Sequence, residues 1–80
     1  MYKAEIEESV YEIVRTTVRN QDIIHTSEII VRAESNLKKD LGLDSLALAE
    51  LAVRVEAKFD IDVFENSIPQ TVGDIIDKLN

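Results

Sequence analysis

The apolar residues near the start of the chain recur with the period of an α-helix, and this spacing constrains the fold more than any other feature. The residues of this apolar stripe are Tyr2, Ile6, Val10, Ile13, Val14 and Val18. Gaps of three and four place them on one helical face. Glutamates concentrate toward the start of the segment and Arg15 and Arg19 toward its end, an order that complements the helix dipole. The pattern predicts an amphipathic helix that stops near Asn20.

A second helix is predicted over residues 44–58, which are rich in Ala and Leu and contain no Gly or Pro. At 100° per residue, one face about 100° wide collects the residues that we assign to the core. These residues are Leu48, Leu51, Ala52, Val55 and Phe59. A second apolar strip of Leu46, Val53 and Ala57 lies away from that face. This helix is therefore more apolar than a single core requires.

Thr71 and Asp74 have the spacing of a capping box and open a last predicted helix. Its buried stripe consists of Val72, Ile75, Ile76 and Leu79. A turn at 60–64 leads into a short helical piece that ends at Pro69, and residues 20–44 form a long connection held to the core by its apolar side chains. We therefore predict an all-α fold: one domain over residues 1–80, a small four-helix bundle of three main helices and one short helix with a long loop after the first helix.

The size and composition of the chain exclude several classes of function. Eighty residues bury too little surface for a deep catalytic cleft, so a carrier or an adaptor is favoured over an enzyme. The chain has no cysteine, which removes disulfides, thiolate metal sites and cysteine nucleophiles. A thioester on this chain would therefore need a prosthetic thiol. No apolar run approaches the roughly 18–20 residues of a membrane span, and we expect a cytoplasmic monomer without membrane insertion.

The formal net charge of −7 argues against nucleic acid and anionic membranes as partners, because both are negatively charged. The charge is uneven. Residues 1–39 hold seven acids and six bases, a net charge of −1, whereas residues 40–80 hold nine acids and three bases, a net charge of −6. We expect partners with basic surfaces to dock on the C-terminal half.

The most specific motif lies where the second predicted helix begins. It reads Asp40-Leu41-Gly42-Leu43-Asp44-Ser45-Leu46 and continues as Ala47-Leu48-Ala49-Glu50-Leu51. This motif resembles the D-L-G-x-D-S-L signature of acyl carrier proteins, and the likeness extends through residues 59–61 and 71–74. The resemblance implies that Ser45 accepts 4′-phosphopantetheine from coenzyme A. It also implies that the chain holds acyl intermediates as thioesters and delivers them to enzymes of fatty acid, polyketide or specialised lipid or polysaccharide pathways.

The residues themselves support Ser45 as an attachment point. Gly42 permits a turn without a Cβ penalty, Asp44 helps to shape it, and Leu43 and Leu46 are expected to anchor its two sides. Ser45 then stands in the first turn of a helix, where unpaired N–H groups and the dipole favour an attached phosphodiester. Taken without the rest of the motif, the Asp-Ser pair would be read only as a helix cap.

The resemblance also implies a docking face on the second predicted helix. The residues we assign to it are Leu46, Glu50, Val53, Arg54, Glu56 and Ala57. The partners implied are a phosphopantetheinyl transferase and acyl ligases, synthases or acyltransferases with basic docking surfaces. The alternative is that the exposed apolar residues are ordinary surface side chains.

The sequence departs from fatty acid carriers at three points. These departures support a specialised, discrete carrier at least as well as a carrier for fatty acid synthesis. Ala47 stands where those carriers place an acid, Arg54 and Lys58 add positive charge, and the segment 59–71 is shorter. Two other interpretations remain open: an aminoacyl or peptidyl carrier, and an adaptor module that is not loaded. The cargo and the pathway are not specified by the sequence.

One histidine and one set of acidic residues are interpreted as surface residues and not as functional sites. His25 lies in the long connection without an orienting partner, so we assign it to the surface and not to catalysis. Asp60, Asp62 and Glu65 lack the spacing of a calcium loop, and we interpret them as a solvated turn. The sequence thus predicts neither a catalytic residue nor a metal site.

Overall fold

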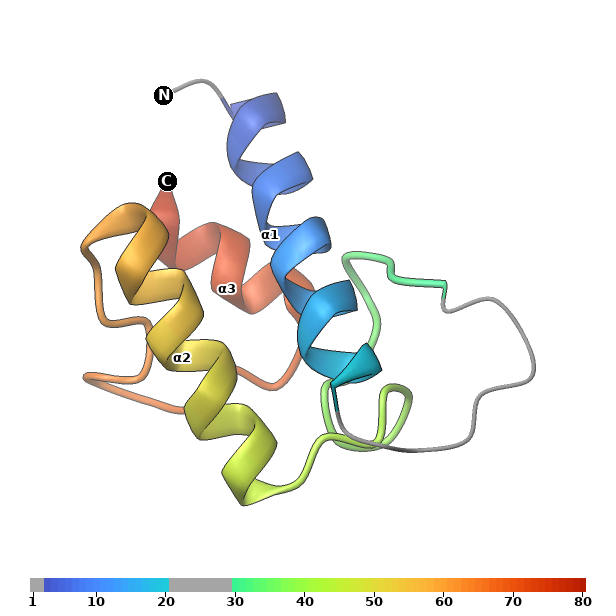
Figure 1. The fold of residues 1–80 in the computed structure, drawn as a ribbon. Coiled ribbons are helices and arrows are strands. Elements are labelled where there is room, and N and C mark those ends of the chain that lie inside the picture. Colours follow the sequence, from blue (N-terminus) through green and yellow to red (C-terminus); the bar gives the residue numbers. More distant parts are fainter. Residues whose placement is uncertain (1–2, 21–29) are drawn as a thin grey trace.

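Three helices form the regular structure of residues 3–20 and 30–80, which are the residues described by this computed structural model. They are α1 (Lys3–Arg19), α2 (Ser45–Phe59) and α3 (Val72–Leu79). Helix α1 packs against both α2 and α3 (Figure 1). Within the described ranges no strand occurs, and the single isolated bridge pairs Asn36 with Thr71.

Helix α1 buries the stripe that its sequence predicts. Its buried residues are Ile6, Val10, Val14, Thr17 and Val18, and Ile13 is half-buried against them. The one polar member, Thr17, donates a hydrogen bond from Oγ1 to the carbonyl oxygen of Ile13 at 2.9 Å, which satisfies its hydroxyl in an apolar setting. The helix ends at Arg19, as the pattern indicated; Tyr2 lies outside the described residues.

Helix α2 buries one face and ends in a left-handed residue. Leu48, Leu51 and Val55 are buried as predicted, whereas Ala52 and Phe59 are half-buried at the edge of the core. Asp60 terminates the helix with φ of 58°, and its N–H donates to the Glu56 carbonyl oxygen at 2.7 Å. Aspartate is one of the few residues that tolerates this conformation, so the chain can leave the helix without a glycine.

Helix α3 begins with the predicted capping box. Thr71 Oγ1 accepts the Asp74 N–H at 3.1 Å, and the Asp74 carboxylate accepts the N–H groups of Gln70 and Thr71 at 3.0 and 3.2 Å. These two backbone donors hold the pKa of the Asp74 carboxyl below its ordinary value. The capping box therefore fixes the residue at which this eight-residue helix begins.

Three backbone hydrogen bonds join the long connection to the start of α3. They run from Leu37 N to Gln70 O at 2.9 Å, from Val72 N to Ser35 O at 3.1 Å and from Gly73 N to Ala33 O at 2.7 Å. The approach is close enough that a Cβ on Gly73 would lie 3.0 Å from the Ala33 carbonyl oxygen. A side chain at this position would therefore push the Ala33 backbone away by a few tenths of an ångström, and glycine avoids this.

The described part of the long connection is held by apolar side chains, which confirms that expectation. Leu37, Leu41 and Leu43 are buried in the core cluster and Val31 is packed against it. Ile30 is exposed. The other isoleucines that we expected to act as anchors, Ile23, Ile24 and Ile29, lie outside the described residues.

The predicted short helix before Pro69 is wrong, because residues 61–70 form turns and bends. The Asp62 side chain accepts the Phe64 N–H at 2.9 Å, and the ammonium of Lys78 donates to the carbonyl oxygens of Val63 and Ser67. These hydrogen bonds use backbone N–H and carbonyl groups that a helix would need for its own hydrogen bonds. The fold is therefore a bundle of three helices with an ordered loop clamped by α3.

The two faces of α2 should differ sharply in their contribution to stability. Leu51 is completely buried and Leu46 is 80% exposed. We expect Leu51→Ala to lower the free energy of unfolding by about 2–5 kcal/mol, and Leu46→Ala to change it by no more than about 0.5 kcal/mol. Urea denaturation followed by circular dichroism measures both. Equal losses in the two variants would contradict the assignment of the core face.

Candidate functional site

Ser45 is the first residue of α2 and is exposed. The residue before it, Asp44, is the N-cap: its carboxylate accepts the Ala47 N–H at 2.8 Å and its carbonyl accepts the Leu48 N–H at 2.9 Å. The N–H groups of Ser45 and Leu46 and the Ser45 hydroxyl make no hydrogen bond to any described residue. Ser45 is therefore an exposed serine in the first turn of a helix, and its hydroxyl and the first two N–H groups have no partner among the described residues.

A left-handed turn leads into this serine. Gly42 has φ of 71°, and its N–H donates to the Lys38 carbonyl oxygen at 3.0 Å. Leu43 is buried and its N–H donates to the Leu37 carbonyl oxygen at 3.0 Å. The expectation that Leu43 anchors the turn is thus confirmed. The same expectation for Leu46 is wrong, because its side chain points into solvent from the first turn of α2.

An unpredicted pair of polar residues shapes the loop that precedes Gly42. The carboxylate of Asp40 accepts the Asn36 N–H at 2.7 Å. In return, the side-chain oxygen of Asn36 accepts the N–H groups of Lys38 and Lys39 at 3.0 and 2.8 Å. The acid of the D-L-G motif therefore has a structural role here. The spacing of Asn36 and Asp40 was the available signal, because both types cap turns through their side chains.

The predicted docking residues divide into two groups. Leu46 and Val53 are 80% and 68% exposed, and Ala57 and Glu56 are also exposed. At 100° per residue, Leu46, Val53 and Ala57 share a narrow strip opposite the buried face of α2. We call these three residues the apolar strip. They form a surface that the packing of the helix does not require.

Glu50 and Arg54 form the second group, which is half-buried. They make an ion pair at 3.5 Å and are four positions apart along the helix. The Nε of Arg54 is buried without a hydrogen-bond partner, because this side chain leans into the junction of α1 and α2. Arg54 is consequently a less accessible docking residue than the sequence suggested.

Ala47, where the resemblance led us to expect an acid, is completely buried. Its methyl group belongs to the core cluster with Leu48 and Leu51. A carboxylate at this position would be desolvated without a partner, which is costly. The departure is therefore explained by packing.

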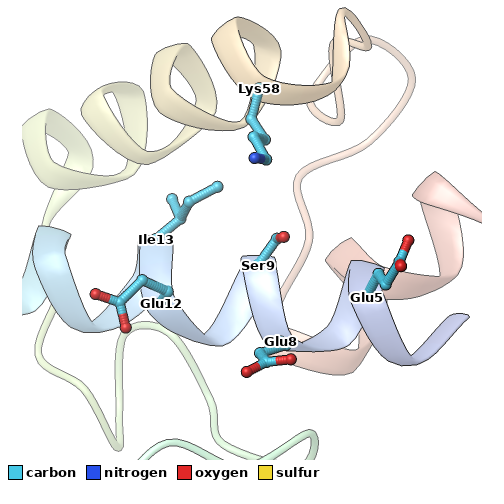
Figure 2. A pocket seen from close by; sticks show the side chains of 6 residues that line it. All are labelled: Glu5, Glu8, Ser9, Glu12, Ile13 and Lys58. Atoms are coloured by element: carbon cyan, nitrogen blue, oxygen red, sulfur yellow. The ribbon is translucent and has the colours of Figure 1, made fainter. Parts of the chain in front are cut away.

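A broad groove lies between α1 and α2 at the end of α2 remote from Ser45. It has a volume of about 650 Å³, and its lining residues are Glu5, Glu8, Ser9, Glu12, Ile13 and Lys58. Figure 2 shows Lys58 reaching from α2 toward α1. Lys58 is thirteen positions after Ser45, which corresponds to about 20 Å along the helix axis. This groove is therefore separate from the serine.

The other polar candidates do not assemble into a reactive centre among the residues the structure describes. Within 3–20 and 30–80, no three His, Asp or Glu side chains gather as a metal site. Asp60 caps α2 and Asp62 closes a turn. His25 lies outside the described ranges. None of the described helices is long and apolar enough to cross a bilayer.

The chain matches a protein-family model. A family model described as "Phosphopantetheine attachment site" matches residues 12–79, a span that contains Ser45, all of α2 and α3 and the C-terminal part of α1. No solved structure matches the chain.

Mutation can distinguish the contribution of the Asp44 cap to stability from that of the exposed Ser45. Asp44→Ala removes the acceptor for the Ala47 N–H and should lower the free energy of unfolding by about 0.5–2 kcal/mol. Ser45→Ala, one residue along, should change it by no more than about 0.5 kcal/mol, because the Ser45 hydroxyl has no partner among the described residues. Urea denaturation of both variants tests this. A larger loss for Ser45→Ala would show that the serine is structural.

Proposed function

The chain belongs to the phosphopantetheine attachment site family, and on this premise we propose that Ser45 carries the group. The family is one of non-catalytic carriers, with 4′-phosphopantetheine as the covalent cofactor and with a phosphopantetheinyl transferase and client enzymes as partners. We propose further that the cargo is an acyl group, held on a discrete carrier formed by a single domain over residues 1–80.

The exposure of the Ser45 hydroxyl, free of any described partner, carries this proposal. It stands at the start of α2, where the free N–H groups of Ser45 and Leu46 suit a phosphodiester bonded to the same residue. The chain enters the site through the Gly42 turn and is held there by buried Leu43. A transferase could thus reach the hydroxyl without unfolding the helix.

The loading reaction that we assign to this serine is a phosphoryl transfer. Ser45 Oγ forms a bond to the phosphorus on the pantetheine side of the coenzyme A pyrophosphate. The bond from that phosphorus to the bridging oxygen breaks, adenosine 3′,5′-bisphosphate leaves, and the serine proton passes to a base of the transferase. The attached arm supplies a thiol that holds the acyl group as a thioester. The chain's own residues present, orient and release this arm.

An acyl carrier for a fatty acid, polyketide or specialised lipid or polysaccharide pathway is supported by the motif around Ser45 and by the net charge of −7. An aminoacyl or peptidyl carrier is the alternative, because it uses the same arm. A helical adaptor that is never loaded is favoured only by the apolar strip, and an adaptor has no use for the presented serine. Monomeric state and a cytoplasmic location stay predictions.

We propose that clients dock on the exposed side of α2. The apolar strip of Leu46, Val53 and Ala57 supplies contact area, and exposed Glu56 lies beside it. Acyl ligases, synthases or acyltransferases with basic surfaces would complement this arrangement. The strip begins one residue after Ser45, so a docked enzyme is close to the arm.

The attachment site is tested by intact mass after incubation with coenzyme A, magnesium and a broad-specificity phosphopantetheinyl transferase. We expect the parent chain to gain one phosphopantetheinyl group and Ser45→Ala to gain none. Ser67→Ala is the matched control, because Ser67 is also an exposed serine, and it should load like the parent. Loading of folded Ser45→Ala would remove this serine from the proposal.

The docking face is tested through the kcat/KM of that loading reaction. Glu56→Lys should lower it several-fold at low salt and less at high salt, because an exposed charge acts mainly on encounter with a basic surface. Glu8→Lys on α1 changes the net charge equally and is exposed, so it serves as the control. An equal effect of both substitutions would show that only the total charge matters.

A further inference from the structure

Asn36 forms hydrogen bonds through both its backbone and its side chain. Its side-chain oxygen accepts the N–H groups of Lys38 and Lys39 at 3.0 and 2.8 Å. Its carbonyl oxygen accepts the N–H groups of Asp40 and Leu41 at 3.0 and 3.1 Å. Its own N–H donates to the Asp40 carboxylate at 2.7 Å. This half-buried residue therefore fixes the backbone of the turn that follows it.

The same turn extends to a buried residue close to the serine. The Gly42 N–H donates to the Lys38 carbonyl oxygen at 3.0 Å, and the Leu43 N–H donates to the Leu37 carbonyl oxygen at 3.0 Å. Leu43 is buried, and it precedes Ser45 by two residues, which span at most about 7 Å. A displacement of the turn would therefore reach the serine, because little chain lies between them to absorb it.

Bonded and free backbone N–H groups meet just before the serine. From 36 to 43, every backbone N–H donates to an acceptor of a described residue. From 44 to 46, none of the N–H groups donates to a described residue. The free groups belong to the surface that receives the phosphodiester in our proposal, whereas the bonded groups belong to the turn that supports it. Asn36 lies entirely within this supporting turn.

Resting on the proposed function, we infer that Asn36 is a positioning residue for the loading of Ser45. Its side-chain oxygen holds the turn, and the turn sets the point from which the Ser45 hydroxyl meets the phosphorus of coenzyme A. The transfer requires these two atoms to be aligned, and a misplacement of about 1 Å can lower the rate by as much as about a hundredfold. Asn36 acts here through the turn and not by touching the attached group.

The effect of losing the Asn36 side chain should fall on kcat and not on KM. Docking in our proposal uses the apolar strip and Glu56, which lie on the exposed side of α2 and not in the turn. Asn36→Ala removes the acceptor for two backbone N–H groups and leaves that docking surface in place. We expect the kcat of loading to fall about tenfold with KM nearly unchanged, the pattern of an interaction that acts only in the transition state.

Three further variants separate positioning from stability. Asn36→Asp retains a side-chain oxygen as acceptor and should recover most of the lost kcat. Asp62→Ala is the matched control and should load with the parent's kcat: Asp62 also closes a turn, by accepting the Phe64 N–H at 2.9 Å, but this turn follows the far end of α2. Asp40→Ala removes the acceptor for the Asn36 N–H. It replaces Asn36→Ala if that variant is unfolded, and the same loss of kcat is expected.

Loading by the transferase is followed by intact mass, with coenzyme A at saturation and the concentration of the full chain varied. The temperature is one at which circular dichroism shows the assayed variants to be folded. A parent chain that does not load at Ser45 would overturn the proposed function. A folded Asn36→Ala, or its replacement Asp40→Ala, with the parent's kcat would overturn this inference alone. So would a change confined to KM, an equal loss of kcat in Asp62→Ala, or no recovery in Asn36→Asp.

Discussion

The three backbone hydrogen bonds that join residues 33–37 to the start of α3 are the constraint on which the site depends. They fix the long connection against the start of α3, which has its own capping box. Leu37, Leu41 and Leu43 then enter the core from a connection whose position is already set. The Gly42 turn follows, and Ser45 is presented at the surface as the end of this sequence of contacts.

Helix α2 carries apolar residues on two faces, and only one of these faces is buried. One face, with Leu51 and Val55, is buried against the rest of the bundle. The other carries the apolar strip, whose exposure brings no stability to the isolated chain. Asp44 caps this helix and thereby fixes the place of exposed Ser45 in its first turn. A carrier needs this combination of a firm support and an accessible surface.

The charged side chains divide in a similar way, between those that bind backbone groups within the fold and those that do not. Asp40, Asp44 and Asp74 accept backbone N–H groups and so act within the fold. Lys78 has a comparable internal role, because its ammonium holds the carbonyl oxygens of the loop before α3. Glu56, Lys38 and Lys39 are exposed and have no such task.

The sequence by itself determined what depends on neighbours along the chain: the stripes of α1 and α2, the capping box at Thr71, the Gly42 turn and the serine at a helix start. Periodicity and capping act over a few residues, so a pattern records them directly. Only the tertiary structure decided that Ala47 is buried, that Leu46 is exposed, and that Lys78 replaces the expected short helix with a clamped loop. These outcomes arise from contacts between segments distant in sequence, where packing overrides local propensity, and no local pattern records them.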